Sequence, residues 1–232
     1  MSFQGFIWNG QNNMIIMLRS LNVGKSCLQL QWLRIPICWL FWGGPQNPHT
    51  TLAECPYFDA QREQTVIKYC IDHHKIVVGT CLGAQLIGES LGFPYEHSPQ
   101  KEIGMFPITI NDDGKQDDVL EDFRPEEELC VWHNDMPGIG DESVILASSA
   151  GYPRQIIHYN PLTYGLQCHM EFTNDSIKSM TVHDDTVKDA IQNSDQYQFV
   201  ESAAELATID CSRSHELLAS LLDHLVLRYD HL

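Results

Sequence analysis

The segment of residues 75–85, Lys-Ile-Val-Val-Gly-Thr-Cys-Leu-Gly-Ala-Gln, constrains the fold of this chain more than any other part of the sequence. Residues 76–78 are a β-branched run, which is typical of a strand covered on both faces. Cys81 follows, with Gly79 two residues before it and Gly83 two residues after it. Both glycines suit a strand that turns sharply into a helix, because Cβ atoms there would meet neighbouring backbone. The pattern is that of a nucleophile elbow with sulfur in place of oxygen.

Residues 82–91 supply the helix of this elbow, and Gly92 ends it. A thiol at a helix N-terminus lies at the positive end of the helix dipole, so the thiolate form of Cys81 is favoured. A Gly-x-Cys-x-Gly string also occurs in purely structural turns, since most cysteines act as small buried hydrophobic residues. The elbow alone therefore predicts a candidate nucleophile and no function.

A histidine and a glutamate further along the chain supply the partners that a cysteine nucleophile needs. His169 and Glu171 are two residues apart, and in an extended segment such side chains point to the same side. The carboxylate can then orient the imidazole as a general base. Together with Cys81, these residues predict a Cys-His-Glu catalytic triad.

Four motifs follow one another in a characteristic order: Gly43-Gly-Pro-Gln46, Gly79-Thr-Cys-Leu-Gly-Ala-Gln85, Trp132-His-Asn-Asp135 and Gln167-Cys-His-Met-Glu171. Through these motifs the chain resembles the class I, or triad, glutamine amidotransferases over residues 41–173. It is most similar to stand-alone proteins that resemble the amidotransferase domain of GMP synthase, because no synthetase domain follows in the sequence.

The resemblance implies an α/β fold with a doubly wound, mostly parallel sheet of the flavodoxin-like type and C-terminal helices. We expect a single amidotransferase-like domain over residues 1–232, in which residues 174–232 form a helical extension. The implied activity is hydrolysis of the glutamine side-chain amide through a cysteine thioester, with ammonia passed to an acceptor enzyme. The resemblance implies neither a metal nor an organic cofactor.

The resemblance also implies roles for individual residues outside the triad. The amides of Gly44 and Leu82 would form the oxyanion hole. The substrate-binding residues would be Gln85, His133, Asn134 and Asp135, and the loop 93–104, with His97 and Glu102, would shape the pocket. The family often has glycine where this chain has Asn134, but asparagine tolerates positive φ better than most residues.

Composition limits the partners and the location. The formal net charge of −17 argues against binding to nucleic acid or to anionic membranes. The apolar run 35–42 is much shorter than the ~20 residues of a membrane span. The eight cysteines contain no Cys-x-x-Cys pair, which indicates reduced thiols in a cytoplasmic protein, although a disulfide stays open. The sequence leaves the oligomeric state and any synthetase partner open.

Other functions fit parts of the pattern. A γ-glutamyl hydrolase on the same scaffold would use the same triad, and an inactive or regulatory homologue would bind substrate without turnover. An α/β-hydrolase with a cysteine nucleophile shares the elbow but expects its acid well before a late histidine. The His169-x-Glu171 spacing favours the amidotransferase.

The first part of the chain has an unusual composition. Residues 1–53 contain no Asp or Glu, although the whole chain has 31. The 42 residues before Gly43 match the length of a β-α-β unit, but residues 1–13 lack a sustained apolar strand and Pro36 interrupts the next run. Correct length with wrong composition predicts a shifted reading frame over residues 1–42. The alternative is a divergent N-terminus with strands at 14–18 and 35–42.

The remaining elements follow from periodicity. Helices are expected at 59–73 and 215–229, the latter with a broad apolar face that packs on its own core. Residues 117–128 read as an acidic helix or loop. Strands are expected at 38–42, 103–110, 129–132, 143–148, 155–159 and 164–168. The segment 133–138 is expected to be a loop.

Overall fold

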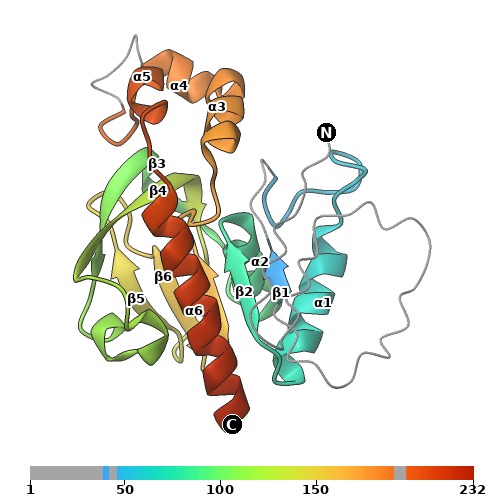
Figure 1. Ribbon diagram of the computed structural model, residues 1–232. Helices are drawn as coiled ribbons and strands as arrows, with labels where there is room; N and C mark the ends of the chain where they lie inside the picture. Colours follow the sequence, from blue (N-terminus) through green and yellow to red (C-terminus); the bar gives the residue numbers. More distant parts are fainter. Residues whose placement is uncertain (1–38, 42–45, 191–196) are drawn as a thin grey trace.

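The computed structural model describes residues 39–41, 46–190 and 197–232 (Figure 1). These residues form one seven-stranded sheet with helices around it. The strands are β1 Trp39–Phe41, β2 Val77–Thr80, β3 Glu96–Ile110, β4 Glu126–Met136, β5 Val144–Ser148, β6 Ile156–Asn160 and β7 Thr163–Leu166. The α-helices are α1 Ala60–Asp72, α2 Leu82–Ser90, α3 Asn174–His183, α4 Asp185–Ala190, α5 Ala203–Leu206 and α6 Ser212–His231.

The strand order across the sheet is β1-β2-β7-β6-β5-β3-β4. Strands β1, β2 and β7 pair in parallel, whereas the other described pairings are antiparallel. The antiparallel part follows from short connections: β6 and β7 are separated by a two-residue turn, which permits only a hairpin. The predicted α/β class is confirmed, but the described sheet is mostly antiparallel, whereas a mostly parallel sheet was expected. Parallel pairing is confined to β1, β2 and β7, the part of the described sheet that carries the elbow.

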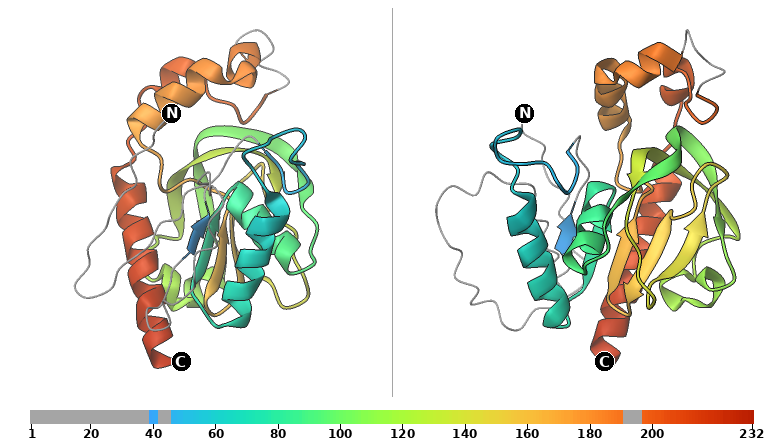
Figure 2. Two further views of the ribbon diagram at one scale, coloured as in Figure 1. Left: turned by 90° about the vertical axis from the view of Figure 1, so that its right-hand side faces the viewer. Right: turned by 180° about the vertical axis from the view of Figure 1, so that it is seen from behind.

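Helices cover both faces of the sheet (Figure 2). Helices α1 and α2 lie on one face, where Ile67 and Leu86 are buried against Val77. Helix α6 crosses the other face and buries a row of leucines in the main core: Leu217, Leu221, Leu222 and Leu225. The expectation that the last helix packs on the core of its own chain is therefore confirmed.

Helices α3, α4 and α5 gather beyond one end of the sheet, above β3 and β4 (Figures 1 and 2). We call these three helices the helical cap. Their apolar side chains form a separate cluster with β3 and β4, in which Ile177, Val187 and Leu206 pack with Trp132 and Phe172. The cap is therefore attached to the sheet by hydrophobic contacts centred on β4.

The structure corrects two expectations about loops and part of a third. Strand β3 begins at Glu96, so most of the expected loop 93–104 is strand. Residues 133–138 were also expected to form a loop, but most of them belong to β4. Glu96 pairs with Met136 across these two strands. Residues 117–128 hold a short 3-10 helix, Asp118–Leu120, and the start of β4. These residues form strands although their local sequence does not favour it, because the preference of a residue for a strand depends mainly on the strands packed beside it.

The strand expected at 38–42 is confirmed at Trp39–Phe41, which pairs with β2. The other expectations for the N-terminal part, namely the strand at 14–18 and the shifted frame, lie outside the described residues. The single-domain organisation stays a prediction. Among the residues that the structure describes, none of the helices combines the length and apolarity that a membrane span requires.

Candidate active site

The elbow has the geometry that its glycines predicted. Cys81 follows β2, precedes α2 and has a φ of 52°, an uncommon value for a residue with a side chain. A Cβ on Gly79 would lie 2.5 Å from the backbone of Gly83, so a larger residue does not fit there. The Cys81 N–H donates to the carbonyl of Leu166 on β7 at 2.7 Å. Strained backbone held by its surroundings is typical of functional turns.

His169 and Glu171 lie in contact just after β7, as their spacing predicted. The Nδ1 atom of His169 is 2.7 Å from a carboxylate oxygen of Glu171. The imidazole is 3% exposed and stacks on the ring of Phe172, with 3.9 Å between centroids. Its Nε2 atom has no hydrogen-bond partner among the described groups. The imidazole is therefore oriented through one nitrogen while the other is available.

The protonation of His169 is controlled by its neighbours. Burial alone would lower the pKa of His169, but the Glu171 carboxylate and the Cys81 side chain outweigh it and raise the pKa to about 10. Cys81 thus lies near enough to the imidazole to affect its titration. The arrangement favours a proton on His169 when the sulfur is a thiolate.

The outer edge of β4 joins these two parts of the site. The Cys130 carbonyl accepts a hydrogen bond from the His169 backbone N–H at 2.7 Å, and two residues later the Trp132 carbonyl accepts the Cys81 thiol at 3.9 Å. Ile103 on β3 lies opposite Trp132. Its N–H donates to the Phe199 carbonyl, and its carbonyl accepts from the Glu201 N–H. Trp132 and Ile103 are therefore a non-hydrogen-bonded pair, whose backbone groups point outward.

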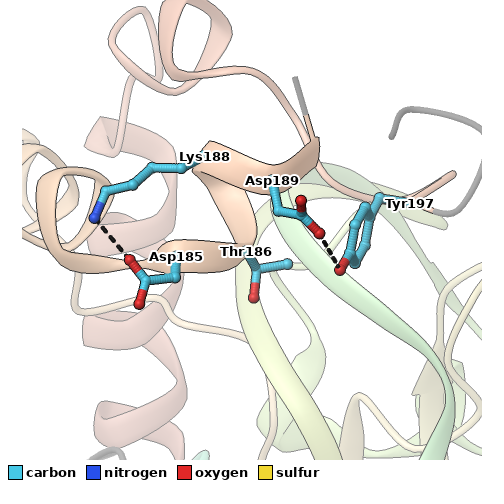
Figure 3. A pocket seen from close by; sticks show the side chains of 5 residues that line it. All are labelled: Asp185, Thr186, Lys188, Asp189 and Tyr197. Carbon is cyan, nitrogen blue, oxygen red and sulfur yellow. Dashed lines mark hydrogen bonds and ion pairs between the residues drawn. The ribbon is translucent and has the colours of Figure 1, made fainter. Parts of the chain in front are cut away.

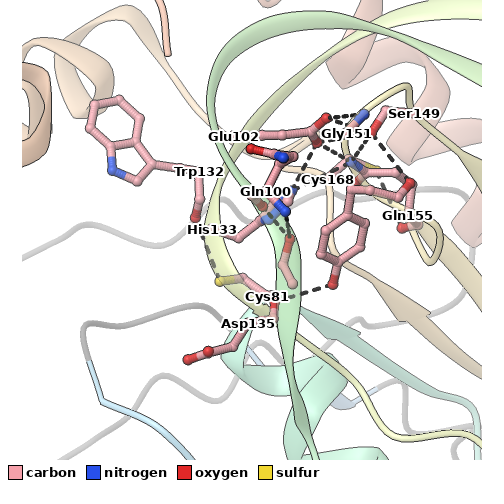
Figure 4. Close-up of polar contacts among 12 residues, drawn as sticks. Cys81, Gln100, Glu102, Trp132, His133, Asp135, Ser149, Gly151, Gln155 and Cys168 are labelled. Atoms are coloured by element: carbon pink, nitrogen blue, oxygen red, sulfur yellow. Dashed lines mark hydrogen bonds and ion pairs between the residues drawn. The ribbon is translucent and has the colours of Figure 1, made fainter. Parts of the chain in front are cut away.

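A buried carboxylate lies behind the site, as Figure 4 shows. Glu102 is fully buried and accepts hydrogen bonds from the Ser149 hydroxyl at 2.8 and 2.9 Å, the Gly151 N–H at 3.1 Å and the Gln155 amide at 2.8 Å. The His133 Nε2 atom lies 3.3 Å from the same carboxylate. Glu102 thus ties together β3, β4 and the segment between β5 and β6, as a buried carboxylate requires.

Burial lowers the pKa of His133, and the nearby Glu102 carboxylate offsets this only in part. The neutral ring then faces Glu102 with a protonated Nε2, because two acceptors would repel each other. Its Nδ1 atom has no partner among the described groups. His133 is therefore a neutral histidine beside the site.

Other residues expected to bind substrate lie at the same end of the sheet. The Gln85 amide donates to the Asp135 carbonyl at 3.4 Å, and the Tyr152 hydroxyl donates to the same carbonyl at 3.1 Å. The Asp135 carboxylate is 2.5 Å from Nδ1 of His97. Asn134 is exposed on β4.

For the expected oxyanion hole, Leu82 begins α2 directly after Cys81, whereas Gly44 lies outside the described residues. Sequence reasoning did not identify Ser149, Tyr152 or Gln155. These polar residues belong to no motif, and only the fold brings them to Glu102 and Asp135.

A hollow on the cap lies apart from these residues (Figure 3). It is lined by Asp185, Thr186, Lys188, Asp189 and Tyr197, which form an Asp185–Lys188 ion pair and a Tyr197–Asp189 hydrogen bond. None of the residues predicted for catalysis or binding lies in it. Within the described part of the chain, no group of three or more His, Cys, Asp or Glu side chains is arranged to hold a metal ion.

Comparisons with known proteins identify the family of this chain. The family model of the glutamine amidotransferase class-I family matches residues 33–188. The glutamine amidotransferase-like protein YfeJ of Salmonella typhimurium is 41% identical over 187 residues, which cover 81% of this chain and 77% of that protein.

Solved structures share the fold. The crystal structure of SMU.1228c superposes with a TM-score of 0.78 at 41% identity, covering 82% of this chain and 80% of the other. A GMP synthase-type protein of Thermoplasma acidophilum gives a TM-score of 0.54 at 16% identity, with 85% and 76% covered. At that identity the likeness concerns the fold alone.

Proposed function

Because the chain belongs to the class-I glutamine amidotransferase family, we propose that it hydrolyses the side-chain amide of glutamine and releases ammonia. The GMP synthase-like resemblance of its motifs agrees with the shared fold. The observation that carries the proposal is the pairing of buried His169 with Glu171 at 2.7 Å, which leaves the Nε2 atom free next to Cys81. A base oriented in this way is what a cysteine nucleophile requires.

In the proposed reaction, Cys81 loses its proton to Nε2 of His169, and the thiolate attacks the carboxamide carbon of glutamine. His169 then returns the proton to the departing nitrogen, the C–N bond breaks, and ammonia leaves a γ-glutamyl thioester. A water molecule gives a proton to His169 and attacks the thioester. Glutamate leaves, and the proton returns to sulfur. Glu171 holds the ring and stabilises its charge throughout.

The negative oxygen of each tetrahedral intermediate needs hydrogen-bond donors. We assign this role to the amide of Leu82, at the N-terminus of α2, and to that of Gly44. Removal of one such donor typically lowers the rate by about 10²–10³-fold. Gln85 and the segment from His133 to Asp135 would bind the amino-acid end of glutamine.

The ammonia is proposed to pass to an acceptor enzyme, such as a separate synthetase protein, in the cytoplasm. The free state of the six described cysteines, which include Cys81, agrees with a reducing compartment. We expect low glutaminase activity from the isolated protein and a rise when the cognate acceptor system is added.

An electrophilic glutamine analogue tests the assignment without requiring turnover. It should label Cys81 alone among the eight cysteines, as found by mass spectrometry of peptides. Cys81→Ala should abolish both labelling and ammonia release, whereas Cys70→Ala, a change of another buried cysteine on α1, should preserve them. Labelling of a different cysteine, or undiminished turnover by Cys81→Ala, would overturn the proposal. Fast, acceptor-independent turnover of γ-glutamyl amides would identify a γ-glutamyl hydrolase instead.

A further inference from the structure

Trp132 contacts the candidate nucleophile with its backbone and the helical cap with its side chain. Its carbonyl accepts the Cys81 thiol at 3.9 Å (Figure 4). Its indole N–H donates to the carboxylate of Asp184 at 2.8 Å, at the junction of α3 and α4. The other Asp184 oxygen accepts the backbone N–H of Thr186 at 2.7 Å. One residue therefore links the cap to the sulfur.

The contact between carbonyl and sulfur selects one protonation state. A carbonyl oxygen accepts a hydrogen bond from a thiol, but it has no hydrogen to offer a thiolate. The Trp132 carbonyl therefore stabilises Cys81 in its protonated form. When the ring is neutral, the Nε2 atom of His169, which has no hydrogen-bond partner among the described groups, is the other candidate acceptor for the same proton. The two acceptors compete for the thiol.

We propose that Trp132 is a positioning residue that holds Cys81 in a protonated resting state, and that Asp184 of the cap fixes Trp132 in this place. The inference rests on the proposed role of Cys81 as nucleophile. The cap has a second polar attachment to the sheet, because the ammonium of Lys101 on β3 donates to the Thr186 hydroxyl at 2.5 Å. A change in the cap that weakens the bond between Asp184 and Trp132 would release the thiol to His169.

The titratable groups around Cys81 are few. His169, backed by Glu171, and Tyr152 interact with its charge. Burial, and then the Cys81 charge, raise the pKa of Tyr152 well above its ordinary value, so this phenol stays neutral near pH 7. His133 adjoins Trp132 and is neutral because burial lowers its pKa. Of these described groups, His169 is therefore the one that can exchange a proton with Cys81.

The test is the pH dependence of Cys81 alkylation by iodoacetamide, followed by peptide mass spectrometry. In Asp184→Asn, the amide oxygen can still accept from Thr186, but the NH₂ group cannot accept from the indole. We expect the pH of half-maximal alkylation rate to fall by about half to one unit, the equivalent of one weak hydrogen bond to the thiol. Trp132→Phe should give the same shift. The matched control is Asp185→Asn, which removes the neighbouring, exposed charge (Figure 3) and should leave the profile unchanged.

The pH profile separates protonation from access to the sulfur. A change that merely opens the site would multiply the rate equally at every pH. An unchanged or higher half-maximal pH in Asp184→Asn, or a uniform change in rate, would overturn the inference. If Trp132→Phe does not fold, the pH profile of Asp184→Asn alone decides whether the inference holds. Failure of the proposed function is distinct, because it would appear as ammonia release by Cys81→Ala.

Discussion

Two buried histidines beside Cys81 each contact a carboxylate, yet their surroundings give them opposite properties. His169 meets Glu171 through Nδ1 at 2.7 Å, and Glu171 together with Cys81 raises the pKa of His169 to about 10. His133 lies 3.3 Å from Glu102 through Nε2, and burial lowers its pKa. The same two residue types therefore produce a strong base in one region and a neutral ring in the other.

Part of the difference comes from Cys81, which also raises the pKa of His169, and part comes from how each carboxylate is shared. Apart from the His133 ring, Glu102 receives hydrogen bonds from Ser149, Gly151 and Gln155, so its charge is already well solvated by the protein. For Glu171, the hydrogen bond resolved in the structure is the one to His169. A carboxylate that several donors satisfy stabilises an added imidazolium less than one that serves a single partner. A buried His–carboxylate contact is thus a candidate base only when few other donors compete.

The largest expected effect separates the two histidines by activity. His169→Ala should lower ammonia release from glutamine by about 10³-fold, because it removes the proposed general base. His133→Gln should lower it by about tenfold at most, the equivalent of one hydrogen bond. Steady-state ammonia release with the cognate acceptor system measures both. Equal losses in the two variants would show that the comparison assigns the base wrongly.

The next effect concerns the pH dependence of stability through His169. Its folded pKa lies above the ordinary 6.5, so its contribution is complete below about pH 6.5 and is lost as pH rises toward 10. In that window the free energy of unfolding should fall by up to about 1.4 kcal/mol per pH unit.

Urea unfolding of Cys81→Ala and of Cys81→Ala/Glu171→Gln tests this slope without titration of the sulfur. Because Cys81 also raises the pKa of His169, the window in this background should end below pH 10. In the double variant the stability should decline less steeply at alkaline pH, since Glu171 is the neighbour that raises the pKa of His169 most. Parallel pH curves for the two proteins would contradict the role given to Glu171.

Glu102→Gln tests the other carboxylate and should cost less. The amide can accept from some of the donors around Glu102, but its NH₂ group faces at least one other donor, which is left without an acceptor. The expected loss is about 1–3 kcal/mol in the free energy of unfolding, measured by urea denaturation. Glu126→Gln, an exposed change on β4, should have little effect. If Glu102→Gln lost no more stability than Glu126→Gln, the Glu102 hydrogen bonds would not be needed for stability.

The sequence predicted the parts of the site that depend on neighbours along the chain. Gly79 and Cys81 define the elbow because the turn is local, and the spacing of His169 and Glu171 brings their side chains together without help from the rest of the fold. The helix after Cys81 was predictable for the same reason. In each case the interacting residues lie within a few positions of one another.

The parts that the sequence did not predict depend on contacts between distant residues. Residues 96–102, with their proline and polar side chains, look like a loop, and the pairing of Glu96, His97 and Glu102 with β4 makes them part of a strand. The contacts of Glu102 with Ser149 and Gln155 span 47 and 53 residues, and that of Trp132 with Asp184 spans 52. No local pattern marks such pairs, since burial and pairing arise from the fold.

The smallest expected effect is the change of stability with pH through His133. It completes the comparison of the two histidines, because stability should fall toward acid pH and not toward alkaline pH. Burial lowers the pKa of His133 below its ordinary 6.5, so the ring stays neutral in the fold while the unfolded chain takes up a proton. Stability should therefore fall as pH drops below about 6.5, by less than about 1.4 kcal/mol per unit. His133→Gln should remove this decline between about pH 7 and pH 5.5, a range above the titration of ordinary carboxylates. His183→Gln, a change of an exposed histidine at the end of α3, should keep the decline. If the free energy of unfolding of wild type and of His133→Gln declines equally at acid pH, His133 is charged in the folded protein. Both histidine–carboxylate pairs would then hold an imidazolium.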